Sequence, residues 1–235
     1  VYPNSKIEDD PFYDVKVRQA VLLYGIDWDN VNILAFAGTA KKSLQHCVEG
    51  SLMYDPDMEK ESYYDAELAK EMLAEAGYPD GFDTTIYATA PNKSAAIAMQ
   101  DELLKINVNA EVQEITFSDT VRWDNTKPGL FLANGYSADD IVLAPISSWY
   151  CSDSTSYGNN IKFSAEYDAL LEEALSAETW DERIECGKEL AWKLHVEECL
   201  YRVFALSPNT TFISDRAHDT GFEYNSLTPE LAWVD

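Results

Sequence analysis

The feature that most constrains the fold of this chain is the alternation of helical and extended patterns along it. One amphipathic helix is predicted between Asp65, which can cap its start, and Gly77, which can take the left-handed position after its end. Four apolar residues fall on one face of this helix, namely Leu68, Met72, Leu73 and Ala76. Pro79 forbids the helix from continuing, and an Asp80-Gly81 turn leads into an extended segment.

Other segments continue this alternation. Further helices are predicted over 14–24, over 28–36, from a Ser94 cap to about Lys105, over 116–123, over 167–175, and from a capping box of Thr179 and Glu182 through Leu194. Strands are predicted over 84–90, 108–112 and 130–133, and the apolar run 200–206 is typical of a central strand covered on both faces. Residues 40–62 lack clear periodicity and predict an irregular excursion. Helices and strands in this order predict a layered α/β domain.

The charge of the chain excludes some classes of partner. Its 235 residues carry 17 lysines and arginines against 42 aspartates and glutamates, a formal net charge of −25. Such acidity repels phosphate backbones and anionic lipid surfaces, so no nucleic-acid or membrane-surface partner is expected. No apolar run of about 18 residues is present to span a bilayer. The chain opens on Val1, without a methionine or a signal-like segment, so its first residue gives no information on targeting.

No catalytic signature is present, and we expect no enzyme, no cofactor and no metal site. The sequence lacks a G-x-S-x-G elbow, an H-E-x-x-H helix and a phosphate-binding glycine loop. The alternative is a metal-assisted hydrolase, in which His195 and Cys199, four residues apart on one helical face, would hold zinc together with Glu198. A buried histidine and a buried cysteine are the simpler interpretation of that pair. The sequence leaves open the pairing of its four cysteines, namely Cys47, Cys151, Cys186 and Cys199.

A more informative set consists of aromatic residues that fall in or near loops. They are Trp123, Tyr136, Trp149, Tyr150 and Tyr157. Aromatic rings at strand ends commonly line concave ligand sites, because a flat ring gives a large contact for little lost entropy. Asp139 and Asp140 follow a predicted strand end, where a carboxylate can bind a ligand ammonium group. Core packing for the rings and turn chemistry for the aspartates account for the same residues equally well.

Four segments, in order along the chain, resemble a known family. They are Pro11-Phe12-Tyr13-Asp14-Val15-Lys16-Val17-Arg18-Gln19-Ala20 with Asp27, Tyr64 through Phe82, Gly135-Tyr136-Ser137-Ala138-Asp139, and Phe163 through Leu171 with Glu182-Arg183. Together they are similar to the family-5 extracellular solute-binding proteins of ABC importers, of the oligopeptide-, dipeptide- and nickel-binding type. Each match is weak by itself, and the set is specific because it keeps the family order over nearly the whole chain.

The resemblance implies a fold and an extent. Family members have two lobes and about twice this length, and the matching segments belong to their C-terminal half. Residues 1–206 would then form the second lobe, an α/β periplasmic-binding-protein-like (type II) unit with a mixed central sheet flanked by helices and a hinge strand near 2–7. Residues 207–235 would return to the missing N-terminal lobe of the same protein.

The resemblance also implies a function. It is that of the substrate-binding component of an ABC importer, which captures a peptide or similar small solute in the cleft between two lobes and delivers it to a permease. Such a protein is expected to be an extracytoplasmic monomer, in the periplasm or at the cell surface, and a lipoprotein parent fits this type. A ligand-sensing receptor module on the same fold is the alternative.

Ligand-binding residues follow from the same resemblance. Asp139 matches the carboxylate that binds the α-ammonium group of a bound peptide, and Tyr136 stands where the family carries a tryptophan. The expected ligand-binding set is Asp139, Tyr136, Trp149, Tyr150, Trp123 and Asp140. Dipeptide-binding members carry an arginine for the ligand carboxylate after the strand that matches 84–90, and this chain has only Lys93 nearby.

Overall fold

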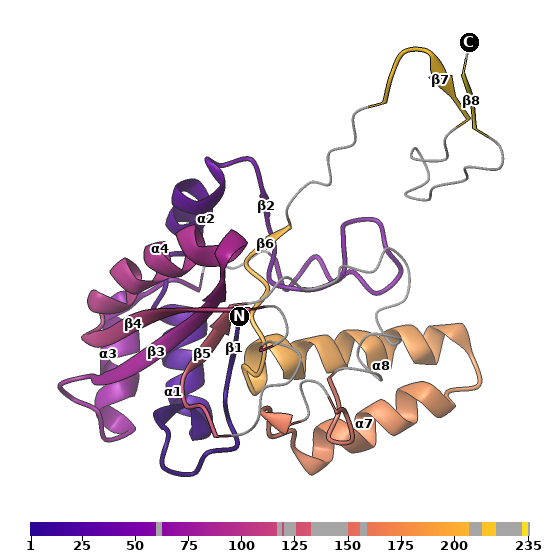
Figure 1. Ribbon diagram of the computed structural model, residues 1–235. Helices are drawn as coiled ribbons and strands as arrows, with labels where there is room; N and C mark the ends of the chain where they lie inside the picture. The colour runs from indigo at the N-terminus through magenta and orange to yellow at the C-terminus, as the bar shows by residue number, and fades with distance from the viewer. Residues whose placement is uncertain are drawn as a thin grey trace.

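The structure is a computed structural model that describes residues 1–59, 63–116, 119, 126–132, 150–155, 159–206, 213–219 and 232–234. A four-stranded sheet lies at the centre, with helices α1 to α4 packed on one face and the pair α7 and α8 on the other (Figure 1). The expected α/β fold, a mixed sheet flanked by helices, is therefore confirmed.

The central sheet mixes parallel and antiparallel pairs. Its strand order is β1 (Tyr2–Pro3), β5 (Leu130–Leu132), β3 (Phe82–Thr89) and β4 (Val108–Ile115). β3 runs parallel to both β4 and β5, whereas β1 runs antiparallel to β5. The three strands predicted over 84–90, 108–112 and 130–133 are all present, which shows that period-2 and short apolar patterns were sufficient to find them.

The helices on the first face begin where acidic capping residues predict. α1 spans Val15–Arg18 and continues as a π-helical segment, Gln19–Tyr24. α2 spans Trp28–Phe36, and α3 spans Ala66–Glu75. The side chains that accept hydrogen bonds from the first-turn N–H groups are Asp14, Asp27 and Asp65. These caps satisfy donors that the helices cannot satisfy themselves, so the three predicted helices are confirmed.

The end of α3 explains why a strand can follow so closely. Gly77 has a φ of +97°, and the Tyr78 N–H donates to the Leu73 carbonyl at 2.8 Å, as in a Schellman motif. At the next turn Gly81 has a φ of +78°, and a Cβ there would lie 1.8 Å from the Asn107 carbonyl oxygen. The two glycines therefore turn the chain from α3 into β3, Gly77 because of its left-handed φ and Gly81 because a side chain would also meet the Asn107 backbone.

The start of α4 differs from the prediction. The helix spans Lys93–Leu104, so it begins before Ser94, and no side chain caps it. A 3₁₀ turn, Ala90–Asn92, precedes it and carries Pro91 in its first turn. Because proline already holds the φ angle of a helix, the turn leads directly into α4, and Ser94 becomes an ordinary exposed first-turn residue.

Two antiparallel helices cover the second face. α7 spans Ala165–Ser176, and α8 spans Trp180–Trp192 and continues as the π-helical segment Lys193–Glu197. The predicted capping box is present: the Glu182 N–H donates to Thr179 Oγ1 at 3.3 Å, and the Thr179 N–H donates to Glu182 Oε2 at 3.1 Å. Both helix predictions in this region are confirmed.

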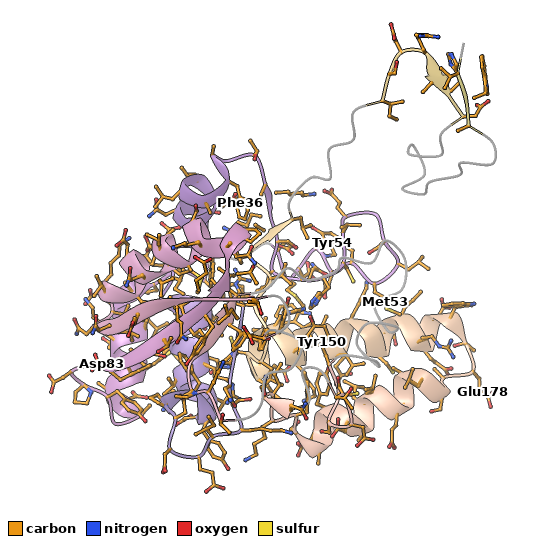
Figure 2. All side chains as sticks on the ribbon, viewed as in Figure 1. Phe36, Met53, Tyr54, Asp83, Tyr150 and Glu178 are labelled. Atoms are coloured by element: carbon orange, nitrogen blue, oxygen red, sulfur yellow. The ribbon has the colours of Figure 1, made fainter. Side chains whose placement is uncertain are left out.

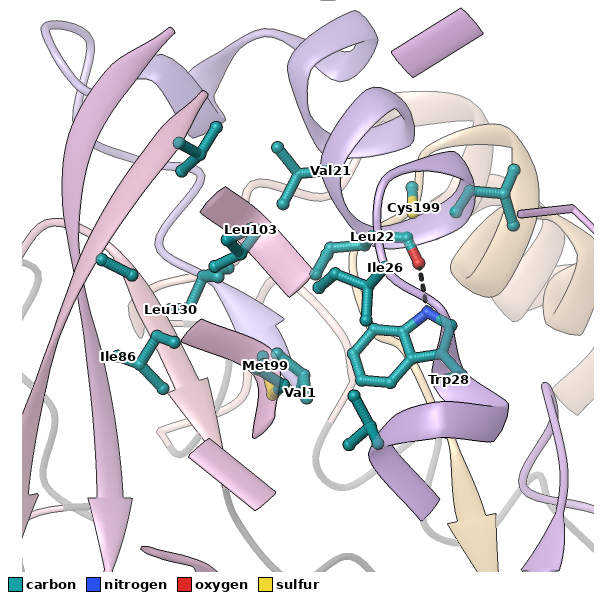
Figure 3. Packing of buried hydrophobic residues seen from close by; sticks show 14 of the residues in the cluster. Val1, Val21, Leu22, Ile26, Trp28, Ile86, Met99, Leu103, Leu130 and Cys199 are labelled. Carbon is teal, nitrogen blue, oxygen red and sulfur yellow. Dashed lines mark hydrogen bonds between the residues drawn. The ribbon is translucent and has the colours of Figure 1, made fainter. Parts of the chain in front are cut away.

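The sheet separates two apolar clusters. Sheet residues facing α1 to α4 are Ile86, Ala88, Val108, Ala110, Leu130 and Leu132. Sheet residues facing α7 and α8 are Tyr2, Tyr87, Ile115 and Phe131. Figure 3 shows the first cluster, in which Trp28 Nε1 donates to the Leu22 carbonyl at 2.9 Å. Such a bond allows a large ring to be buried without losing a hydrogen bond.

The excursion predicted over 40–62 is described up to residue 59, where it consists of turns around the two-residue strand β2 (Lys41–Lys42). Gln45 Nε2 donates to the Asp55 carbonyl at 2.8 Å, and the Asp55 N–H returns a bond to Gln45 Oε1 at 3.0 Å. Trp192 Nε1 donates to Asp55 Oδ2 at 2.8 Å. Side-chain hydrogen bonds therefore fix this irregular segment against the end of α8.

The apolar run 200–206 is not a central strand, so that prediction was wrong. Only β6 (Ala205–Leu206) is extended and paired, and its partner is β2 in a separate two-stranded sheet. The reason is that the backbone N–H groups of residues 200–202 already donate to the carbonyl groups of Leu194 and Val1.

Backbone hydrogen bonds to Leu194 and Val1 keep residues 200–202 from forming a central strand. The Leu200 and Tyr201 N–H groups both donate to the Leu194 carbonyl, at 2.9 and 3.3 Å. The Arg202 N–H donates to the Val1 carbonyl, and the Val1 nitrogen donates to the Arg202 carbonyl, both at 2.7 Å. The run therefore closes the end of the helix and then pairs with the first residue of the chain.

Three smaller observations complete the fold. Of the helix predicted over 116–123, residues 117, 118 and 120–123 lie outside the described part of the chain. Strands β7 (Ala217–His218) and β8 (Trp233–Val234) form a small antiparallel pair. Among the helices that the structure describes, none combines the length and the apolar character needed to cross a bilayer.

Candidate functional site

The three parallel strands end level with one another. Thr89, the last residue of β3, pairs with Ile115, the last residue of β4. Ala88 pairs with Leu132, the last residue of β5. The carboxyl ends of the three strands lie along one edge of the sheet, which we call the carboxyl edge. In open α/β sheets, ligands bind in the crevice outside this edge, so it is the candidate functional site.

A turn and an ion pair occupy part of the carboxyl edge. Asn92 Nδ2 donates to Thr89 Oγ1 at 3.1 Å. Lys93, at the start of α4, places its Nζ 3.1 Å from Glu114 Oε2, and both side chains are about half exposed. An exposed pair of this kind contributes only about 0–1 kcal/mol to stability. The pair matters here for charge, because Glu114 neutralises Lys93, the cation that lies near the end of β3.

A carboxylate lies beyond the end of β4. Asp119 Oδ2 accepts hydrogen bonds from the N–H and the hydroxyl group of Thr116, both at 2.9 Å. The backbone bond, and then the hydroxyl bond, lower the pKa of Asp119, so this carboxyl is ionised at neutral pH. Lys127 also lowers the pKa of Asp119, so this described part of the edge carries charges of both signs.

Five of the six predicted ligand-binding residues lie outside the described part of the chain. They are Trp123, Tyr136, Asp139, Asp140 and Trp149. The segment that carries Tyr136 and Asp139 follows Leu132, the last residue of β5, directly in the sequence. Their roles stay predictions.

Tyr150, the sixth predicted residue, lies in the interior. Only 1% of its surface is exposed, and its ring centroid is 5.1 Å from that of His46 and 4.9 Å from that of Tyr201. Figure 2 shows Tyr150 between the sheet and α8. A role of this residue toward a ligand stays a prediction, and its position gives it a role in packing.

Tyr150 belongs to a set of packed rings that we call the interior ring cluster. Its members are Tyr2, His46, Tyr150, His195 and Tyr201. Tyr2 stacks on Tyr201 at 6.0 Å and also on Phe131 of the neighbouring strand at 5.2 Å. The cluster therefore joins the start of the chain to the segment after α8 across the second face of the sheet.

Two histidines in this cluster share a hydrogen bond. His195 Nδ1 lies 2.7 Å from the Tyr201 carbonyl oxygen, and His46 Nδ1 lies 3.1 Å from His195 Nε2. A carbonyl only accepts, so His195 carries its proton on Nδ1 and accepts from His46 at Nε2. Burial is the main cause that lowers the pKa of both rings, to about 3 for His195, so both are neutral at pH 7.

These contacts weaken the metal-site alternative. Both ring nitrogens of His195 are used, Glu198 accepts a hydrogen bond from Ser164, and burial raises the pKa of the Cys199 thiol to about 11. A metal needs a thiolate and a free imidazole nitrogen. Within the described residues, no group of three histidine, cysteine or carboxylate side chains is placed to hold a metal. The four cysteines, which all lie in the described part of the chain, form no disulfide with one another.

The segment around Arg18 has a structural role that sequence reasoning missed. Arg18 Nε donates to the Glu198 carbonyl at 2.8 Å, and its Nη1 donates to the Phe12 carbonyl at 2.9 Å. Gln19 Nε2 donates to the Glu197 carbonyl at 2.8 Å. Two neighbouring side chains thus satisfy carbonyl groups left over at the end of the last helix. The apolar pattern around them gave no signal for this contact, which spans about 180 positions of the chain.

A separate cavity of about 490 Å³ lies at the opposite end of β3 and β4. Its polar lining includes Asp10, Asp83, Thr85, Asn109 and Glu111. Asn109 Nδ2 donates to Asp83 Oδ1 at 2.9 Å, and burial raises the pKa of Asp10. This cavity is remote from the carboxyl edge and carries no feature that would select a ligand.

Comparison with known proteins gives a consistent result. Residues 1–158 match the family described as "Bacterial extracellular solute-binding proteins, family 5 Middle". The heme-binding protein A of Haemophilus influenzae is 31% identical over 200 residues, which cover 80% of this chain and 36% of that protein. The glutathione-binding protein GsiB of Pectobacterium atrosepticum is 33% identical over 117 residues, 47% of this chain and 22% of that protein.

Solved structures share the fold. The periplasmic binding protein DppA of Helicobacter pylori, in complex with the peptide STSA, has a TM-score of 0.74 and 22% identity, over 87% of this chain and 40% of its own. The dipeptide binding protein of Pseudoalteromonas sp. SM9913, in complex with Met-Leu, has a TM-score of 0.73 and 26% identity, over 88% of this chain and 42% of its own. The chain thus spans less than half the length of each of these proteins.

Proposed function

Because this chain belongs to the bacterial extracellular solute-binding proteins of family 5, we propose that it captures a peptide or similar small solute at its carboxyl edge and delivers it to an ABC permease. Capture would involve no chemistry. The solute would enter between this lobe and a second lobe of the same protein, and closure would require tighter binding to the closed state than to the open one. The protein would work outside the cytoplasm as a monomer, with or without a lipid anchor.

The observation that carries this proposal is the level ending of β3, β4 and β5. Three parallel strands end at one edge, and Tyr136 and Asp139 follow the last residue of β5 closely in the sequence. Asp139 would bind the ammonium group of the solute, with Asp140 beside it in sequence, and Tyr136, Trp123 and Trp149 would supply apolar walls. The ionised carboxyl of Asp119 beyond the end of β4 is in keeping with this assignment.

The paired ends of the chain support the two-lobed arrangement. Val1 and Arg202 exchange both backbone hydrogen bonds, which places the start of the chain beside the segment that leads to residue 207. We propose that residues 1–206 form one lobe, that the segment near 2–7 and the segment after Arg202 are its two connections, and that 207–235 returns to the other lobe. Two residues of adjacent antiparallel strands exchange their backbone hydrogen bonds in the same way.

The chemistry of the described residues favours a peptide-like solute with an amino group. Lys93 already pairs with Glu114, so a ligand carboxylate would have to compete with this ion pair. Heme is less favoured, because iron needs an axial ligand such as histidine. His46 and His195 are buried and bonded to each other, and His218 stacks on Trp233 at 4.1 Å.

Replacing Asp139 by alanine is expected to weaken binding of a peptide mixture by about tenfold or more, because a charge-assisted hydrogen bond is lost. Isothermal titration calorimetry on the complete two-lobed protein measures this change. The matched control is Asp83→Ala, which removes a carboxylate at the opposite end of β3. Equal affinity of the Asp139 and Asp83 variants would remove Asp139 from its assigned role.

Zinc content separates this proposal from the hydrolase alternative. After extensive dialysis we expect far less than one zinc ion per chain, because His195 and Cys199 are held in forms that do not bind metal. Atomic absorption on the dialysed protein gives the stoichiometry. Retention of about one ion per chain, lost in His195→Asn, would favour the metal-assisted enzyme. A receptor module would differ in its partner, so transport of the solute by a permease is the test of that alternative.

A further inference from the structure

A hydrogen bond between two imidazole rings joins the irregular segment 40–59 to the end of α8. His46 lies in this segment, and His195 lies in the π-helical continuation of α8. Because the Tyr201 carbonyl requires the proton of His195 on Nδ1, His46 Nδ1 is the donor toward His195 Nε2, at 3.1 Å. The bond needs a lone pair on His195 Nε2, so it exists only while His195 is neutral.

A second proton on either ring would place a charge in the interior. His46 is 4% exposed and His195 is 1% exposed. The His46 ring centroid lies 4.8 Å from that of Tyr201 and 5.1 Å from that of Tyr150. The other titratable groups of the interior ring cluster are the phenols of these two tyrosines and of Tyr2. An ionised imidazole among such rings loses its hydration without a counterion.

The charged groups that act on the two rings do not offset such a charge. After burial, His195 is the next cause that lowers the pKa of His46. Arg202 lowers the pKa of His195, and the terminal amine of Val1 lowers the pKa of both rings. Among the described residues, no carboxylate is a main cause acting on either ring. Protonation therefore favours any state in which His46 reaches water.

The segment 40–59 is the side of this contact that can move. It consists of turns around a two-residue strand, and irregular segments open at a lower free energy than core helices and strands. Opening must break the bond from Trp192 to Asp55, at 2.8 Å, and the contact of Met53 with Gly187, where an added Cβ would lie 2.6 Å from the methionine sulfur. The open form is therefore a minor state at neutral pH.

His195 is held more firmly on its own side. The π-helical segment that carries it ends where Arg18 and Gln19 donate to two carbonyl groups, both at 2.8 Å. These bonds satisfy acceptors that the helix end leaves over, and they fix it to the first face of the sheet. Opening of the ring cluster is therefore expected to release the segment 40–59 and to leave the end of α8 in place.

We propose that the His46–His195 pair is an acid-sensitive switch that releases the segment 40–59 from α8 when the surroundings become mildly acidic. In the open form, solvated His46 takes up a proton near the ordinary imidazole pKa of about 6.5. The closed form excludes this proton, so acidification shifts the equilibrium toward the open form. The segment also carries β2, which pairs with β6, so its release would loosen the backbone pairing that precedes residue 207.

Hydrogen exchange of the 235-residue chain, followed by mass spectrometry at pH 7 and pH 5, tests the proposal. After correction for the intrinsic pH dependence of exchange, protection within 43–58 is expected to fall by about tenfold or more at pH 5, because one exposed imidazole favours the open form by that order. A local opening exposes little surface, so this exchange should hardly depend on low urea. Exchange in α4 and β4 requires global unfolding and should depend steeply on urea.

Two variants assign the effect to the histidines. The double variant His46→Phe with His195→Asn has no titrating ring at either position, so protection within 43–58 should not fall between pH 7 and pH 5. Two carboxylates, Asp55 and Glu59, also accept hydrogen bonds in the segment. Glu59→Gln is therefore the matched control: it removes a carboxylate but keeps the Oε1 acceptor of the Leu44 N–H, and it should show the wild-type fall.

Three results would each overturn the proposal. The first is exchange within 43–58 that depends on urea as steeply as that of α4 and β4, because the segment would then open only when the whole chain unfolds. The second is unchanged protection at pH 5, which would also follow if a carboxylate outside the described residues accepted a bond from the protonated ring. The third is a wild-type fall in the double variant. The first two need only the wild type, and none needs the solute, so they are independent of the transport function.

Discussion

Replacing Arg18 by methionine is expected to lower the free energy of unfolding by about 3–5 kcal/mol, as breaking a buried charge interaction does. Arg18 donates to the carbonyls of Phe12, Tyr13 and Glu198 at 2.8–2.9 Å. Methionine fills much of the same volume but leaves these acceptors unpaired in the interior, and each buried unpaired group costs about 1–3 kcal/mol. Urea denaturation followed by circular dichroism measures the change.

An exposed lysine on the same helix gives the control. Lys16 pairs with Glu75 at 2.9 Å, and its side chain is 42% exposed, so Lys16→Met should change stability by less than about 1 kcal/mol. Arg18→Lys keeps the charge but cannot reach three carbonyls with a planar fork, so we expect it to fall between the two. Equal stabilities of the Arg18→Met and Lys16→Met variants would show that the bonds to Glu198 and the Phe12 turn do not hold the lobe together.

Acidification from pH 7 to pH 4.5 is expected to remove about 2–5 kcal/mol of stability through His46 and His195 together. Burial lowers the pKa of His195 to about 3 and that of His46 well below 6.5. The unfolded chain therefore binds protons below pH 6.5 while the folded chain does not. Stability from this pair is complete above about pH 6.5 and is lost progressively as the pH falls toward 3, where the folded His195 is protonated as well.

A non-titrating pair isolates this effect from the many carboxylates of the chain. The double variant His46→Phe with His195→Asn keeps a ring at the first position and a donor toward the Tyr201 carbonyl at the second. Its absolute stability will differ, but its slope of stability against pH between 6.5 and 4.5 should be shallower than that of the wild type. Parallel slopes for wild type and the double variant would contradict the assignment.

Local signals predicted those elements whose ends are marked by residues with few alternatives. α3 is bounded by Asp65 and Gly77, and α8 begins at a capping box, so their starts and ends could be read directly. The start of α4 was placed too late, because a proline turn supplied helical geometry before Ser94. Sequence alone does not show whether a proline ends one element or begins the next.

The errors and omissions at longer range have a different cause. Residues 200–202 have an apolar strand pattern, but their backbone donors are used by Leu194 and by Val1, and the second partner lies 201 positions away. Tyr150 in a loop gave no periodic signal that it would be buried among rings. At the candidate site, the sequence predicted only that Asp139 and Asp140 follow a strand end, whereas the pairing of Lys93 with Glu114 depends on the register of β3 and β4.

The hydrogen-bonded pair of Val1 and Arg202 places the two ends of the segment 1–202 side by side. A short linker that joins these two ends, with new termini opened in the exposed turn between α7 and α8, would give a circular permutant. We expect this permutant to keep the four-stranded sheet and both apolar clusters. By the same reasoning this segment could be grafted into a surface loop of an unrelated host, because its two attachment points are a single β-pair apart.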